Sequence, residues 1–174
     1  MATVQLGILV SLGCSNNDGA AVDLPPKPST DITVPTAVTP SPADETAEVR
    51  RTYVESVALL DRADTLPEGT RRQRLAQYLT DPQLSRILDR IKDLHAENLT
   101  SYGASVPHIK SVKVEGDKAT VHDCQDSSNS GLMDATTQRK INRGVKEESI
   151  KALMQKHSDG RWRISKFVVL GEGC

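Results

Sequence analysis

His122 and the aspartates that follow it, Asp123 and Asp126, are the residues whose types and spacing could support acid–base chemistry. Histidine titrates near neutral pH, and a carboxylate beside it can share or direct its proton. Successive residues of a strand point to opposite faces, so His122 and Asp123 would make a poor dyad. His122 and Asp126 therefore remain as catalytic candidates, against the simpler interpretation of a histidine at a half-buried strand edge.

No other residues suggest a catalytic or metal centre. The remaining histidines are scattered, and no Cys or His pair has the spacing of zinc ligands, so we expect no metal and no cofactor. The chain carries 22 basic and 23 acidic residues and only 3% aromatics. A nucleic-acid-binding protein usually has a basic excess and aromatic stacking residues, so we expect no nucleic-acid partner.

Cys14 follows the longest apolar run, VQLGILVSL at residues 4–12. The run is too short to span a bilayer, which needs roughly 20 residues, but has the length of a signal-peptide core. Ser11-Leu12-Gly13-Cys14 resembles the bacterial lipobox, whose cysteine receives a lipid, although Ser11 stands where leucine is usual. We expect residues 1–14 to be a signal peptide with a lipid (diacylglycerol, palmitate) on Cys14. The alternative is a buried N-terminal strand.

Residues 15–44 contain six of the nine prolines and many serines and threonines. Such a segment cannot bury enough apolar surface to offset the entropy lost on ordering. We expect a disordered tether that joins the lipid to a folded domain at residues 45–174. An apolar run, a cysteine and a polar spacer in this order predict a protein anchored to the outer, extracytoplasmic face of the cell membrane.

Apolar periodicity predicts helices in the first half of the domain. Residues 45–63 place apolar side chains on one helical stripe, residues 70–79 suggest a short helix, and a third helix runs from Asp81-Pro82 to about Asn98.

Alternating patterns predict strands in the second half of the domain. Residues 112–114 and 119–121 flank a Gly-Asp turn, and strands follow at 147–157 and from Trp162, whereas 125–144 reads mostly as loop. Helices followed by antiparallel strands predict an α+β fold, with the N-terminal helices packed on a curved sheet of about four strands.

Two stretches carry a resemblance to a known family: VKVEGDKATVHDCQDSS at 112–128 and SDGRWRISKFVVLGEGC at 158–174. With the helices before them, they resemble the NTF2-like, cystatin-superfamily domains of actinobacterial secreted lipoproteins. The resemblance covers roughly residues 45–174 and implies a cone-shaped fold. It says little about function, because this fold hosts enzymes, binding modules and scaffolds.

Cys124 and Cys174 are the two cysteines left once Cys14 is assigned to the lipid. The resemblance and the signal-like start favour a disulfide between them, which would require the last strand to lie close to the strand of Cys124. The alternative is two free thiols in a cytosolic protein.

Clustered arginines at Arg71, Arg72 and Arg74, near Arg50 and Arg51, could contact anionic lipid head groups or wall polymer. The simpler interpretation is a solvated helix face.

Three functions follow from these observations. The first is a non-enzymatic lipoprotein that binds an envelope protein or a small ligand at the cell envelope. The second is a small-molecule enzyme, a hydrolase or isomerase, that uses the pocket of the cone. The third is a scaffold subunit of a secretion or conjugation machine.

Overall fold

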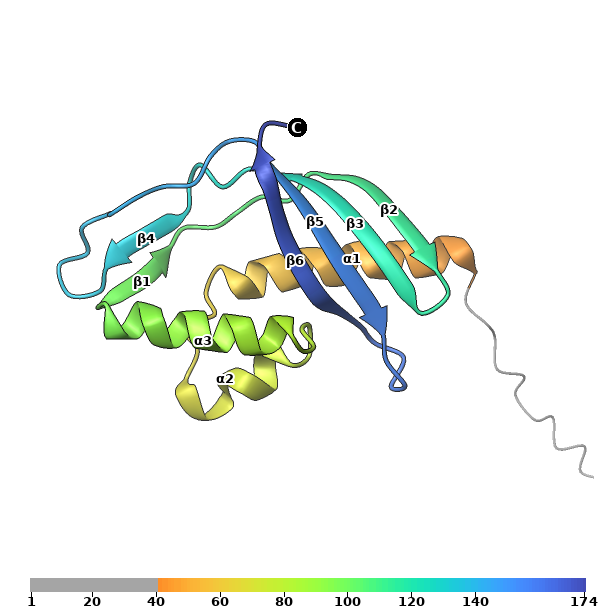
Figure 1. The fold of residues 1–174 in the computed structure, drawn as a ribbon, viewed down its shortest axis with the longest axis horizontal. Coiled ribbons are helices and arrows are strands. Elements are labelled where there is room, and N and C mark those ends of the chain that lie inside the picture. Colours follow the sequence, from red (N-terminus) through yellow and green to blue (C-terminus); the bar gives the residue numbers. More distant parts are fainter. Residues whose placement is uncertain (1–40) are drawn as a thin grey trace, which may run out of the picture. The chain divides into compact units, whose positions relative to one another are not determined.

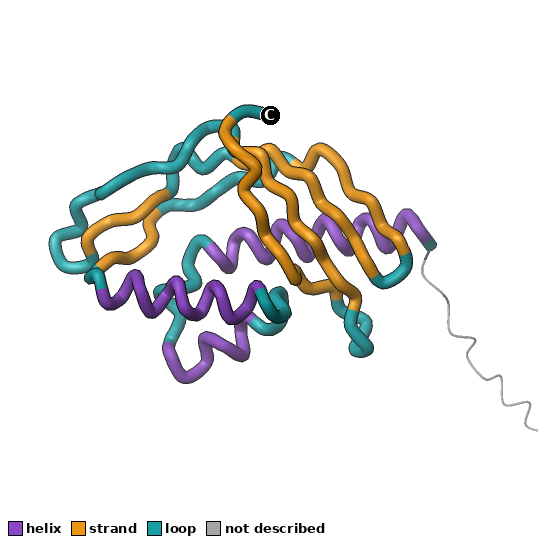
Figure 2. Tube along the Cα trace, in the orientation of Figure 1, coloured by secondary structure: helices purple, strands orange, loops and turns teal. Residues whose placement is uncertain are grey.

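A computed structural model describes residues 41–174, and Figures 1 and 2 show how its elements are arranged. The expected signal peptide, Cys14 and most of the tether lie outside these residues. In this described part of the chain, three helices come first and six strands follow. The elements are α1 (Pro42–Leu60), α2 (Glu68–Leu75), α3 (Gln83–Ala96), β1 (Leu99–Tyr102), β2 (Ile109–Glu115), β3 (Lys118–Gln125), β4 (Gly131–Asp134), β5 (Glu148–Lys156) and β6 (Trp162–Glu172).

Helix α1 begins three residues before the expected start, because Ser41 and Asp44 form a capping box. Pro42 occupies the first helical turn, where its missing N–H costs no hydrogen bond. The apolar stripe of α1 is buried, with Val49 and Tyr53 fully inaccessible to solvent. Glu45, in the first turn, accepts hydrogen bonds from Lys156 and from the Trp162 indole, so the start of α1 is fixed to the end of β5 and the start of β6.

Helix α3 buries Leu84, Ile91 and Leu94, as its apolar spacing predicts. The Asp81 carboxylate accepts a hydrogen bond from the Ser85 backbone N–H at 3.1 Å, which satisfies one of the free donors at the start of the helix. The shorter α2 buries Leu75. No helix among residues 41–174 combines the length and apolarity needed to cross a membrane.

The main sheet has four antiparallel strands in the order β2–β3–β5–β6. Gly116 and Asp117 form the predicted two-residue turn between β2 and β3. Inward residues Val121, Ala152 and Ile164 are fully buried and belong to the same core cluster as the apolar residues of all three helices. The helices therefore cover one face of the sheet, as in the α+β layout that the sequence predicts, and that fold class is confirmed.

A second sheet, which pairs β1 with β4, was not predicted. The sequence pattern predicts no strand at residues 99–102 and mostly loop at residues 125–144. Both strands have only four residues, and all eight are half-buried without alternation. Strands are predicted from alternating apolar and polar residues, and these two strands show no such alternation, so the sequence does not reveal them.

Cys124 and Cys174 lie with their Cα atoms 5.9 Å apart and are joined in a disulfide. The last strand is near β3, as the pairing requires, but β5 lies between the two strands. Cys124 stands opposite Ser149 in the register, and Ser149 stands opposite Gly171. The tail after Gly171 therefore crosses the start of β5, and Gly173 adopts a positive φ of 83° on the way.

Candidate functional site

The strongest candidate site consists of two adjoining concavities between α1, α3, β6 and the small β1–β4 sheet. Their volumes are ≈ 270 Å³ and ≈ 300 Å³, and both are lined by Leu60, Ser101, Leu132 and Phe167. A concavity of this size, formed where several elements meet, suits a small molecule. We call the pair the cone pocket.

The walls of the cone pocket are mainly apolar. Phe167, from β6, lines both halves and stacks on Tyr53 with ring centroids 6.3 Å apart. Tyr53 belongs to the core, so this contact fixes the Phe167 ring on a rigid support. The other apolar side chains of the larger half are Leu60, Ala63, Ile87, Ile91, Leu94 and Leu132.

Asp64 lines the larger half and is 4% exposed. Its Oδ2 accepts hydrogen bonds from the Thr100 hydroxyl at 2.6 Å and from the Ser101 backbone N–H at 2.9 Å. Burial opposes ionisation, but these hydrogen bonds outweigh it, so the pKa of Asp64 falls below its ordinary value. Its Oδ1 is buried and has no hydrogen-bond partner among the described residues.

Asp61 lines the other half of the cone pocket. Both of its carboxylate oxygens accept hydrogen bonds from Ser105, one from the backbone N–H at 2.9 Å and one from the hydroxyl at 3.0 Å. Burial nevertheless raises its pKa. Asp61 and Asp64 thus hold β1 and the segment after it against the end of α1, which closes this side of the pocket.

Gln125, the last residue of β3, lines the same half as Asp61 and is 7% exposed. Its amide N–H donates to the Ser127 hydroxyl at 3.0 Å. Its carbonyl Oε1 is buried and has no partner within residues 41–174. A buried acceptor without a partner costs roughly 1–3 kcal/mol, so a donor that reached Oε1 would bind favourably.

Asp123 also lies on the inward face of β3, behind Tyr53. The Tyr53 hydroxyl donates to Asp123 Oδ2 at 2.9 Å, while Oδ1 is buried and unpartnered among the described residues. Burial raises the pKa of Asp123, and burial together with the neighbouring carboxylate raises that of Tyr53. Within residues 41–174, Asp64, Gln125 and Asp123 each keep one buried oxygen without a hydrogen-bond partner, and each of these oxygens can accept a hydrogen bond.

The structure does not bring the two catalytic candidates of the sequence to this pocket. His122 is exposed on the opposite face of β3, where it stands across from Ser111 and Lys151. Asp126 accepts hydrogen bonds from the Ser128 backbone N–H at 2.9 Å and hydroxyl at 2.6 Å, and these bonds lower its pKa. Asp126 thus stabilises the turn after β3.

The residues that line the pocket with polar groups were not singled out from the sequence. In the sequence, Asp61 and Asp64 read as polar residues at the end of the first helix. Gln125 reads as the first residue of a loop. The alternation of β3 is the one sequence signal that could have identified inward polar residues, because it places Asp123 and Gln125 on the face opposite His122. Within residues 41–174 no group of three or more potential ligands is placed to hold a metal ion.

No family model matches the sequence, and no curated protein matches it. Among solved structures, the chain is similar to the intermembrane-space region of the chloroplast protein ARC6, with 17% identity and a TM-score of 0.56 over 73% of this chain and 97% of that one. This likeness shows a shared fold.

Two further solved structures have lower scores. An NTF2-like protein from Silicibacter pomeroyi has 14% identity and a TM-score of 0.43 over 74% of this chain and 98% of that one. CagV, a VirB8 homologue of a Helicobacter pylori type IV secretion system, has 10% identity and a TM-score of 0.44 over 74% and 99%. Neither value supports an argument about activity or partners.

Proposed function

We propose that this protein is a lipid-anchored, extracytoplasmic binding protein with an NTF2-like domain. Its cone pocket takes up a small, largely apolar molecule that carries a hydrogen-bond donor, such as a hydroxyl or an amine. The protein binds this molecule without transforming it. The anchor on Cys14 and the tether of residues 15–44 rest on the sequence alone, as does the likeness to actinobacterial lipoproteins.

The unpartnered acceptors of the cone pocket are the observation that carries this proposal. Phe167 and Leu132 offer apolar contact, and one buried oxygen each of Gln125 and Asp64 has no donor among residues 41–174. Buried polar groups in folded proteins are nearly always satisfied, so we infer that a ligand or an ordered water supplies the missing donors. A ligand with an apolar body and one donor fits both features.

Two matched probes test this chemistry. 2-Naphthol and 2-methoxynaphthalene have the same ring system, but only the first can donate a hydrogen bond. Satisfying a buried acceptor contributes roughly 1–3 kcal/mol, and a binding free-energy difference of about 1.4 kcal/mol corresponds to a tenfold difference in affinity. We therefore expect the protein to bind 2-naphthol about tenfold more tightly than 2-methoxynaphthalene. Isothermal titration calorimetry of both probes measures the ratio.

The variant Gln125→Leu removes one of the two free acceptors and should lower the ratio of the two affinities. Gln155→Leu, the same change at an exposed position of β5, should leave the ratio unchanged. Equal affinity of the unsubstituted protein for the two probes would contradict the proposed ligand chemistry.

A second candidate function is an acid–base enzyme that uses the same pocket. The observation in its favour is that burial raises the pKa of Asp61 while hydrogen bonds lower that of Asp64, in adjoining halves of the pocket. Carboxylates with pKa values pushed apart can serve as acid and base. Both carboxylates, however, already hold the β1 segment in place.

Mass spectrometry tests the enzyme hypothesis by looking for chemical change of a bound probe. A change that the parent chain produces and the variant Asp64→Asn does not would favour the enzyme. The scaffold hypothesis stays a prediction of the sequence.

A further inference from the structure

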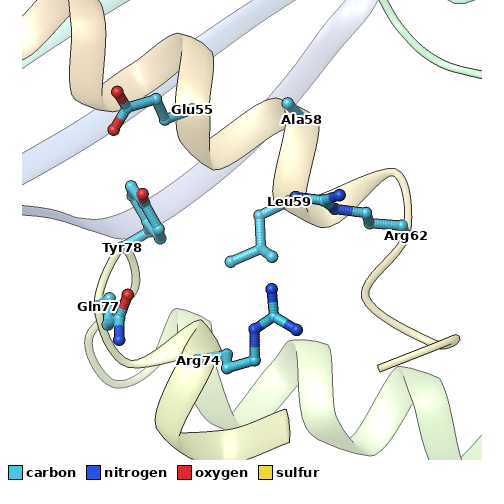
Figure 3. A pocket seen from close by; sticks show the side chains of 7 residues that line it. All are labelled: Glu55, Ala58, Leu59, Arg62, Arg74, Gln77 and Tyr78. Carbon is cyan, nitrogen blue, oxygen red and sulfur yellow. The ribbon is translucent and has the colours of Figure 1, made fainter. Parts of the chain in front are cut away.

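A second concavity lies away from the cone pocket, between α1 and the segment that contains α2. It has a volume of ≈ 230 Å³ and is shown in Figure 3. Its lining residues are Glu55, Ala58, Leu59, Arg62, Arg74, Gln77 and Tyr78. We call it the arginine cleft.

The two arginines of the cleft come from different segments. Arg62 follows the end of α1 and Arg74 belongs to the last turn of α2. Figure 3 shows both guanidinium groups turned into the same space beside Leu59. Both arginines are exposed to solvent, and an anion that bound between them would be attracted by both charges.

No carboxylate of the described domain neutralises this pair. Neither Arg62 nor Arg74 takes part in an ion pair within residues 41–174, whereas Arg163 pairs with Asp159 and Arg51 with Glu48. Glu55 lines the cleft, but in Figure 3 its carboxylate lies beside Tyr78, at the end away from the arginines. The charge of the two guanidiniums is thus available to a ligand.

The shape of the pair favours a phosphate over a carboxylate. A guanidinium donates through a planar fork, and one carboxylate edge satisfies one such fork. A phosphate offers oxygens in several directions and can accept from two forks that approach from different sides. Leu59 gives the cleft an apolar floor, and a neighbouring concavity of ≈ 290 Å³, which shares Glu55, Gln77 and Tyr78, leaves room for an organic substituent.

We propose that the arginine cleft binds the phosphate group of a phosphate ester between Arg62 and Arg74. The ester could be a membrane lipid head group or a free metabolite, because both present the same group. This site is separate from the cone pocket, and the proposal does not depend on the ligand of that pocket.

The full chain with Cys14→Ser, which removes the expected lipid attachment, is the protein to test. Glycerol 3-phosphate is titrated and followed by calorimetry. We expect binding that weakens with added salt, and a loss of affinity of at least about tenfold in the double variant Arg62→Gln/Arg74→Gln. Glu55→Gln should tighten binding by about threefold, because it removes a nearby negative charge.

The double variant Arg50→Gln/Arg86→Gln is the matched control, since it removes two exposed arginines that do not line the cleft. It should keep the affinity of the parent chain. Equal weakening in both double variants would mean a general charge effect and overturn the site, as would equal binding of acetate. Absence of glycerol 3-phosphate binding would overturn it when no vesicle binding depends on the two arginines.

Vesicles of phosphatidic acid and of phosphatidylcholine distinguish the two sources of the ester. Arginine-dependent sedimentation with phosphatidic acid alone would identify a lipid head group. Binding of glycerol 3-phosphate without arginine-dependent sedimentation would identify a free ester. Either result supports the cleft. Sedimentation that the double variant leaves unchanged, together with no glycerol 3-phosphate binding, would overturn it.

Discussion

At the residue scale, the polar groups of the cone pocket depend on partners distant in sequence. Asp64 is held by Thr100 and Ser101, and Asp61 by Ser105, which lie 36 to 44 residues later in the chain. No local spacing encodes such pairs, so the sequence could not single them out. The alternation of β3 did predict that His122 and Asp123 point apart, and the structure confirms this: one is exposed and the other is 3% exposed.

Asp123 should make stability depend on pH. Burial raises its pKa above the ordinary 3.8, so in the intervening range the folded chain binds a proton that the unfolded chain has lost. The free energy of unfolding therefore falls as pH rises through this range, and it stays lower at higher pH because the buried carboxylate is then charged. We expect Asp123→Asn to remove this fall, with a relative gain at neutral pH of up to about 1–3 kcal/mol. Urea unfolding at pH 3 to 7 measures it.

Tyr53→Phe provides the opposite test of the same pair. It removes the donor to Asp123 Oδ2 but keeps the ring that stacks on Phe167. Because the hydrogen bond from Tyr53 favours the charged carboxylate, its loss should steepen the fall in stability with pH. A free-energy difference between Asp123→Asn and the parent that is constant with pH would show that Asp123 does not titrate in this way.

At the element scale, the sequence predicted the elements that pack with a regular period. The stripes of α1 and α3 and the alternation of β2, β3 and β5 each place apolar residues on one face, and the core is built from those faces. The β1–β4 sheet was missed because its residues are half-buried on both faces. This small sheet contributes Ser101 and Leu132 to the cone pocket, so the candidate site was missed together with it.

The disulfide between Cys124 and Cys174 should stabilise the end of the main sheet, because it ties the tail after β6 to β3 across β5. The two cysteines are 50 residues apart in sequence, and the chain-entropy model gives about 4 kcal/mol for a loop of that length. We expect Cys174→Ser to lower the melting temperature in oxidising buffer, as measured by circular dichroism, and non-reducing peptide mass spectrometry to find the two cysteine peptides linked.

A reducing agent supplies the control for this prediction. In excess dithiothreitol, the parent chain and Cys174→Ser should melt at the same temperature, because both then lack the bond. If the parent chain melts at one temperature with and without the reductant, the bond does not contribute to stability in the way expected.

At the scale of the whole molecule, the two proposals together describe a domain with two separate candidate ligand sites and an anchor that only the sequence suggests. The cone pocket opens between helices and the small sheet, and the arginine cleft lies between α1 and α2. The two sites have different chemistry, one apolar with free acceptors and one cationic. A binding protein held close to a membrane would meet both amphipathic molecules and phosphate head groups there.

The anchor gives the last prediction. An acylated Cys14 would hold the protein in the membrane, because each buried methylene group contributes about 0.8 kcal/mol and a diacylglycerol carries two chains. We expect Cys14→Ser to move the protein from the membrane fraction to the medium or the non-membrane fraction, as immunoblotting of both fractions measures. Radiolabelled palmitate should appear on the parent chain and not on the variant. A parent chain that carries no label would contradict the lipid anchor, and the proposed location outside the cytoplasm would then rest on the disulfide between Cys124 and Cys174, since such bonds persist in oxidising compartments.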